Sequence, residues 1–114
     1  MRHVLLLGVA VMVGLVISAC GGGTTPEPTG PQADDPVLLA GMEIYAERCA
    51  RCHGSAGGGG AAPGLSGERL KERFPDPSDQ EEIVRHGRGA MPAHDRVLDD
   101  DEIEAVVAYT REVL

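Results

Sequence analysis

Large side chains are scarce in this chain of 114 residues, and their scarcity limits what the chain can fold into on its own. The aromatic residues are Tyr45, Phe74 and Tyr109, and there is no Trp. Because aromatic side chains bury the most apolar surface, a small domain with so few of them has a poor core. Such domains are commonly stabilised by a disulfide, a metal ion or a cofactor. The sequence therefore predicts that something besides side chains fills the middle of the fold.

Residues 1–19 have the pattern of a secretory signal peptide. A short basic start precedes residues 4–17, which carry no charge and are too few for the roughly 20 residues of a membrane span. Ser18-Ala19-Cys20 resembles the cleavage site of a bacterial lipoprotein, in which the cysteine becomes the lipidated N-terminus. An ordinary signal peptide and an uncleaved anchor are the alternatives, and all three place the remaining chain outside the cytosol.

Residues 20–36 are expected to hold the lipidated cysteine and a flexible linker. The stretch from Gly21 to Pro36 reads GGGTTPEPTGPQADDP and has no apolar periodicity. A segment of this composition cannot bury a core. One folded domain, residues 37–114, is left.

Apolar residues in this domain recur at helical spacing. A first stripe runs from Leu38 to Cys49, and a second runs from Ile103 to Leu114 behind the acidic residues 99–102, which suit a helix N-terminus. Shorter helices are expected over residues 66–74 and 78–86, the latter opened by a capping box at Ser78. Since no alternating strand pattern is present, we expect an all-α fold of three to four short helices and long loops.

The charge of the chain excludes one class of partner. The net charge is −8, with 18 acidic against 10 basic residues. Nucleic-acid binding needs clustered basic residues and stacking aromatic rings, so a nucleic-acid ligand is not expected. An acidic surface instead favours partner proteins with basic docking patches.

Cys49-Ala50-Arg51-Cys52-His53 carries the clearest chemistry. Cys-x-x-Cys-His is the attachment motif of c-type haem. Two thiols three residues apart on a helical turn can each form a thioether with one haem vinyl group, and His53 is then held where its imidazole can bind iron. One covalently bound haem c would also supply the large apolar body that the core lacks.

The cysteine pair has three alternative uses. A thioredoxin-like pair would follow a strand, whereas this one follows a helical stripe. A zinc site would need closely spaced further ligands, but seven residues separate His86 from His94 and there is no second cysteine pair. A structural disulfide between Cys49 and Cys52 is open in an oxidising compartment. The cysteine count favours haem, because two thioethers and a lipidated Cys20 account for all three thiols.

Met91 is the expected second ligand of the iron. It lies in a glycine-containing loop between two predicted helices, whereas a core methionine lies on a periodic helix face. A thioether suits haem iron, and a Met/His pair raises the reduction potential. His94, in the same loop, is the alternative ligand, while His86 is expected at a helix end and Met42 in the core.

With these motifs, residues 38–113 resemble a small bacterial class I monohaem cytochrome c. Gly41 and Tyr45 precede the first cysteine by eight and four residues, like the small and aromatic residues at which the family's first helix crosses its last. Val106 and Tyr109 resemble the partner residues on the last helix. The resemblance implies a cytochrome c-like fold wrapped around the haem.

The same resemblance implies a role for Pro63. In the family, the carbonyl of a loop proline accepts a hydrogen bond from the proximal imidazole, here that of His53. One departure is the missing Trp, so no donor to a haem propionate can be assigned.

Electron transfer is the expected function. If His53 and Met91 fill both axial positions, no position is left for oxygen or peroxide. The resemblance implies a carrier rather than an enzyme, tethered outside the cytosol by its lipid anchor and exchanging electrons with respiratory complexes. A haem sensor or ligand-binding haem enzyme with a labile sixth ligand, and a dedicated cytochrome subunit of a larger oxidoreductase, are the alternatives.

Overall fold

A computed structural model of the chain describes residues 23–114, so the signal peptide and Cys20 lie outside the described residues. The elements are η1 (Gly30–Gln32), α1 (Pro36–Ile44), the π-helical turn η2 (Tyr45–Cys49), α2 (Ala50–His53), α3 (Gly67–Arg73), α4 (Pro77–His86) and α5 (Asp100–Glu112). Because α1, η2 and α2 follow one another without a break, the main body has four helical segments. Within residues 23–114 no strand is present, apart from one isolated bridge between Arg88 and Met91. The predicted all-α class is confirmed.

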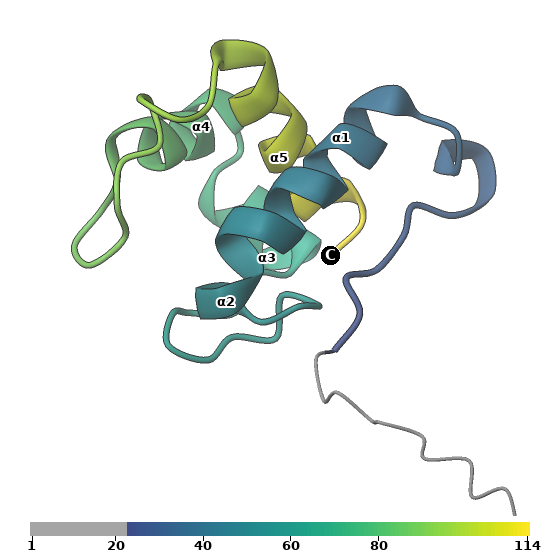
Figure 1. Cartoon of the computed structure of the whole chain (residues 1–114), viewed down its shortest axis with the longest axis horizontal. Coiled ribbons are helices and arrows are strands. Elements are labelled where there is room, and N and C mark those ends of the chain that lie inside the picture. The colour runs from purple at the N-terminus through teal and green to yellow at the C-terminus, as the bar shows by residue number, and fades with distance from the viewer. Residues whose placement is uncertain (1–22) are drawn as a thin grey trace, which may run out of the picture.

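Helices α1 and α5 cross at the centre of the domain (Figure 1). Gly41 allows the close approach, since a Cβ on it would collide with the carbonyl oxygen of Ala105 and lie 2.7 Å from the Cβ of Tyr109. Beside this point the fully buried rings of Tyr45 and Tyr109 lie 5.5 Å apart and are tilted by 47°. With Val106 they form the core cluster, so the helix crossing implied by the resemblance is present.

The helix caps in the structure agree only in part with those predicted from the sequence. The N-cap of helix α4 is Asp76, two residues before the expected Ser78, and its side chain accepts from the amide of Ser78 at 3.0 Å. The predicted capping box at Ser78 is therefore wrong. A capping box does form at α5, where Asp99 and Glu102 each accept from the backbone amide of the other at 2.9 Å.

A small polar network joins α3 and α4 to α5. The buried Gln80 side chain donates to Thr110 Oγ1 at 2.9 Å, and Arg111 donates to the Phe74 carbonyl at 2.9 Å. Buried polar groups of this kind must be paired, because an unsatisfied one costs about 1–3 kcal/mol. The network fixes how α3 and α4 sit on α5.

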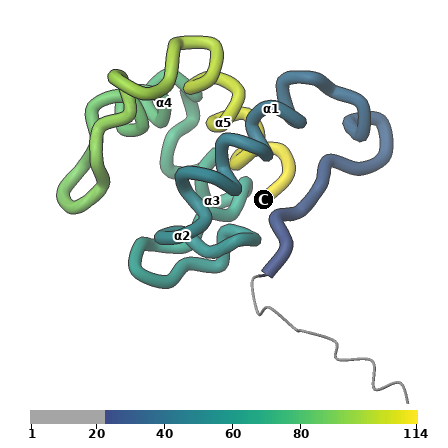
Figure 2. Tube along the Cα trace, viewed as in Figure 1, coloured from purple at the N-terminus to yellow at the C-terminus, as the bar shows by residue number. Residues whose placement is uncertain are grey.

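The described part of the segment before α1 lies against the helices. The hydroxyl of Tyr109 donates to the carbonyl of Pro26 at 2.6 Å, and Pro28 is buried. Gly23 packs against the side chain of Ser55, in the loop that follows α2. Figure 2 shows the segment rising beside the C-terminus, turning at η1 and entering α1. No helix within residues 23–114 is long and apolar enough to span a membrane.

Candidate functional site

The Cys-x-x-Cys-His motif lies at the end of the first helical segment. A π-helical turn widens the helix just before it, a feature often found at functional sites. Cys49 and Cys52 are free and half-buried. His53 is the last residue of α2, which Gly54 ends with a φ of 85° that other residues rarely adopt.

Cys49 does not have the environment of a reactive thiol. Burial raises the pKa of the Cys49 thiol to about 11, with Arg48 opposing this rise and Cys52 adding to it. Cysteines active in disulfide exchange have lowered pKa values in electropositive surroundings. The apolar contacts of Cys49 with the core cluster suit a thioether sulfur better than a thiolate.

The loop after α2 is held in shape by hydrogen bonds to the motif. Amides of the loop donate to the carbonyls of His53 and Cys52 at 2.7 and 2.9 Å. The buried Tyr45 donates through its hydroxyl to the carbonyl of Gly54 at 2.7 Å, and burial raises the pKa of Tyr45 to about 12, so this hydroxyl keeps its proton. Sequence analysis missed this tie between the core and the loop, because the acceptor is a backbone group that any residue offers.

The His53 ring has one nitrogen engaged. Its Nδ1 lies 2.8 Å from the carbonyl oxygen of Pro63, the contact that the resemblance implies. Because a carbonyl only accepts, Nδ1 must carry the proton, and Nε2 then has the free lone pair that a metal needs.

Met91 belongs to the loop between α4 and α5, and this loop is at the left of Figure 1. The backbones of Arg88 and Met91 exchange two hydrogen bonds of 3.1 and 3.0 Å across a tight turn, which Gly89 permits with a φ of 60°. The amide of His94 donates to the last carbonyls of α4, those of Val84 and Arg85. We call residues 87–97 the Met91 strap; its half-buried Met91 is thus held by backbone hydrogen bonds on both sides.

A groove of about 370 Å³ joins the Met91 strap to the attachment motif. It is lined by Glu47, Arg48, Arg51, Pro92, Ala93, His94 and Val97. His94 is 9% exposed, and its Nδ1 has no hydrogen-bond partner within residues 23–114. His86, by contrast, is exposed at the end of α4 and lies 3.2 Å from Glu82, which agrees with the sequence.

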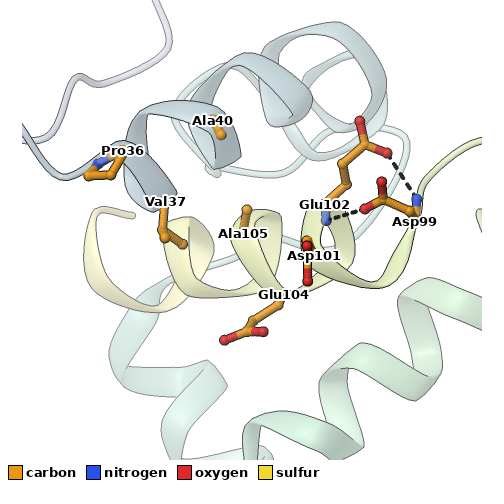
Figure 3. Close-up of a pocket in the computed structure, with 8 residues that line it drawn as sticks. All are labelled: Pro36, Val37, Ala40, Asp99, Asp101, Glu102, Glu104 and Ala105. Atoms are coloured by element: carbon orange, nitrogen blue, oxygen red, sulfur yellow. Dashed lines mark hydrogen bonds between the residues drawn. The ribbon is translucent and has the colours of Figure 1, made fainter.

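A second groove, of about 400 Å³, lies elsewhere, between the N-terminal ends of α1 and α5 (Figure 3). Its walls carry the acidic side chains of Asp99, Asp101, Glu102 and Glu104, and two of these are engaged in the α5 capping box. It contains none of the site residues predicted from sequence. The candidate site is therefore the region of α2, its loop and the Met91 strap.

The donor set of this region fits haem c. Two free cysteines stand at the spacing that two vinyl groups require, and the contact of His53 Nδ1 with the Pro63 carbonyl leaves Nε2 of the neutral ring for a metal. A thioether on a fixed strap is available as a second ligand.

Comparison with known proteins identifies the class. Residues 36–109 match the family described as cytochrome c oxidase, cbb3-type, subunit III. The chain belongs to this family and has a cytochrome c domain, the class of domain that carries covalently bound haem c. It is 35% identical over 88 residues to the cbb3-type cytochrome c oxidase subunit CcoP of Azospirillum sp. (strain B510), covering 70% of this chain but only 30% of that protein.

Similar proteins of comparable length are cytochromes c6. The chain is 34% identical over 73 residues to cytochrome c6 of Euglena gracilis, covering 60% of this chain and 84% of that protein. It is also similar to the structure of cytochrome c6 from the diatom Phaeodactylum tricornutum, with a TM-score of 0.55 and 34% identity over 65% of this chain and 90% of that one. The cytochrome c-like fold is confirmed.

Proposed function

We propose that this protein is an electron carrier with one haem c, attached through Cys49 and Cys52 and ligated by His53 and Met91. The observation that carries the proposal is the hydrogen bond between His53 Nδ1 and the Pro63 carbonyl, directly after two free cysteines. That arrangement prepares a metal ligand, and neither a disulfide pair nor a thiol redox pair requires it. Bound haem supplies one chemical step, the gain or loss of one electron at iron.

The residues around the motif position the proposed ligands. The Pro63 carbonyl fixes the orientation of the His53 ring and increases its strength as a donor to the metal. Tyr45 holds the Gly54 carbonyl, which keeps the following loop against the helix. Met91, held by the turn of the strap, would be the second ligand of the iron and would then leave no position for oxygen or peroxide, which supports a carrier over an oxygen-binding enzyme.

The proposed setting is outside the cytosol, on a membrane. A lipidated Cys20 would tether the domain, and respiratory complexes would be its donor and acceptor. On long-range attraction alone, a chain of net charge −8 favours partners with basic docking patches. The similarity to CcoP supports a second candidate, a haem subunit within a larger oxidase.

Absorption spectra of the purified protein, oxidised and reduced, test the proposal together with a pyridine haemochrome assay. A c-type haemochrome and a far-red methionine–iron band are expected. Met91→Leu should keep the covalent haem, lose that band, lower the reduction potential and allow carbon monoxide to bind. Met42→Leu is the matched control, since Met42 packs against the core cluster, and it should change none of these. An unchanged band in Met91→Leu would show that another residue ligates the iron.

A further inference from the structure

Positive charge gathers around the candidate site although the chain as a whole is acidic. The attachment segment, residues 47–53, and the Met91 strap together hold four arginines and two acidic side chains, in a chain of net charge −8. The four are Arg48, Arg51, Arg88 and Arg96, and all are exposed.

Most of these arginines are not neutralised by an ion pair. Arg51, Arg88 and Arg96 have no acidic side chain within ion-pair distance among residues 23–114, and the contact between Arg48 and Glu47 is long, at 3.8 Å. Arg85, just before the strap, is in contrast paired with both Glu82 and Asp100. Acidic side chains gather instead around the second groove, on α5 (Figure 3).

The groove of about 370 Å³ has the features of a contact surface. It carries Arg48 and Arg51 on one wall, and Val97, a large apolar side chain that is 53% exposed, among the residues of the other. His94 also lines the groove and is only 9% exposed. The groove is also the place where the two segments that carry the proposed iron ligands meet at the surface.

We propose that this arginine-lined groove is the docking surface for the redox partner, and that the partner presents an acidic patch to it. The inference rests on the proposed function and names the class of partner for the same site. The positive charge around the groove favours an acidic partner, whereas the negative net charge of the chain favours a basic one. Local charge should dominate at contact, because interactions between exposed charges fade beyond the Debye length of about 8 Å at physiological ionic strength.

Two small oxidants of opposite charge test the local charge on the haem-loaded protein. In each reaction one electron leaves the ferrous protein, which becomes ferric, and reduces either hexacyanoferrate(III), an anion, or tris(phenanthroline)cobalt(III), a cation. No proton or other group moves. If arginines flank the place where the electron leaves, the anion reacts faster and the cation more slowly than the net charge predicts.

The variant Arg48→Gln/Arg51→Gln removes two positive charges from the groove. We expect its rate with hexacyanoferrate(III) to fall about three- to tenfold at low salt, and its rate with the cobalt complex to rise by a similar factor. A change in reduction potential would move both rates in the same direction, so opposite changes identify an effect of charge.

The matched control is Thr29→Glu/Ala33→Glu, which changes the net charge by the same amount. Both residues flank η1 and are exposed. The η1 turn, dark blue in Figure 1, lies on the opposite side of the domain from the loop between α4 and α5. At low salt the control should change both rates less than the arginine variant does, because its added charges lie on the far side of the domain. At physiological ionic strength, where the Debye length is about 8 Å, the control should change them by less than about twofold.

A binding measurement gives an independent readout. The paramagnetic anion hexacyanochromate(III) should broaden the amide NMR signals of Arg48, Arg51, Ala93 and Val97 before those of α3, which also carries basic residues. Broadening that begins on α3, equal effects of the two double variants, or rates that move in the same direction would each overturn the docking surface. Failure of the proposed function would look different, since the protein would then show no covalent haem in the pyridine assay.

Discussion

Replacing Gly41 by Ala sets helix propensity against the packing of the two central helices. In an exposed helix the change would stabilise the protein by about 1 kcal/mol, since Ala is the better helix former. Here the new methyl group would collide with the carbonyl oxygen of Ala105 and lie 2.7 Å from the Cβ of Tyr109. Both contacts involve α5 close to its backbone, which cannot turn aside as a flexible side chain can.

The packing cost should exceed the propensity gain. Overpacking a core costs about 1–3 kcal/mol, and separating the rings of Tyr45 and Tyr109 would lose about 0.5–1.5 kcal/mol more. After the gain of about 1 kcal/mol in propensity, we expect Gly41→Ala to lower the free energy of unfolding by about 1–3 kcal/mol. In urea, the unfolding midpoint of the haem-loaded protein should fall by about 1 M with an unchanged slope.

Gly58→Ala is the matched control for this prediction. A Cβ at Gly58 meets nothing within 4 Å, and its φ is not positive, so its stability should change by less than about 0.5 kcal/mol. If Gly41→Ala were as stable as the parent protein, or more stable, α1 and α5 would not approach as closely as described, and the argument would be refuted.

Three further predictions concern the N-terminal segment, a helix cap and the anchor. Tyr109→Phe removes the hydrogen bond to the Pro26 carbonyl; the free energy of unfolding should fall by about 1 kcal/mol, and limited proteolysis should cut residues 23–36 faster. Hydrogen bonds from the amide and hydroxyl of Ser78 lower the pKa of Asp76. The Asp76 carboxylate therefore stabilises the folded protein above the pKa that it has in the unfolded chain, and this stabilisation is lost as the pH falls. The urea midpoint of Asp76→Asn should accordingly change less between neutral and acid pH than that of the parent protein. Cys20→Ser should move the protein from the membrane pellet to the soluble fraction if the cysteine is lipidated, and persistence in the pellet would support an uncleaved anchor.

Local pattern predicted the helices well because each buries one apolar face. The stripe from Ile103 to Thr110 is buried as expected, and α3 (Gly67–Arg73) lies within the expected range 66–74 with Ser66 as its N-cap. The start of α4 was misplaced because two residues offer the same chemistry: Asp76 and Ser78 can both cap a helix. Pro77 favours the earlier start, since proline is well suited to the first helical position and has no amide to leave unpaired.

The parts of the site that consist of neighbouring residues in the sequence could be predicted, whereas the parts that depend on the helix crossing could not. Adjacent residues define the attachment motif, and the resemblance supplied the contact between His53 and Pro63. The groove, in contrast, exists because the Met91 strap returns across the first helical segment, and no spacing in the sequence encodes that approach. The net charge is a sum and does not say where the charges lie. A net charge of −8 favours basic partners. In the structure, however, the arginines lie beside the proposed ligands, and many of the acidic residues lie at the start of α5. For a carrier that docks through a small surface, the position of a few charges therefore decides which partner fits.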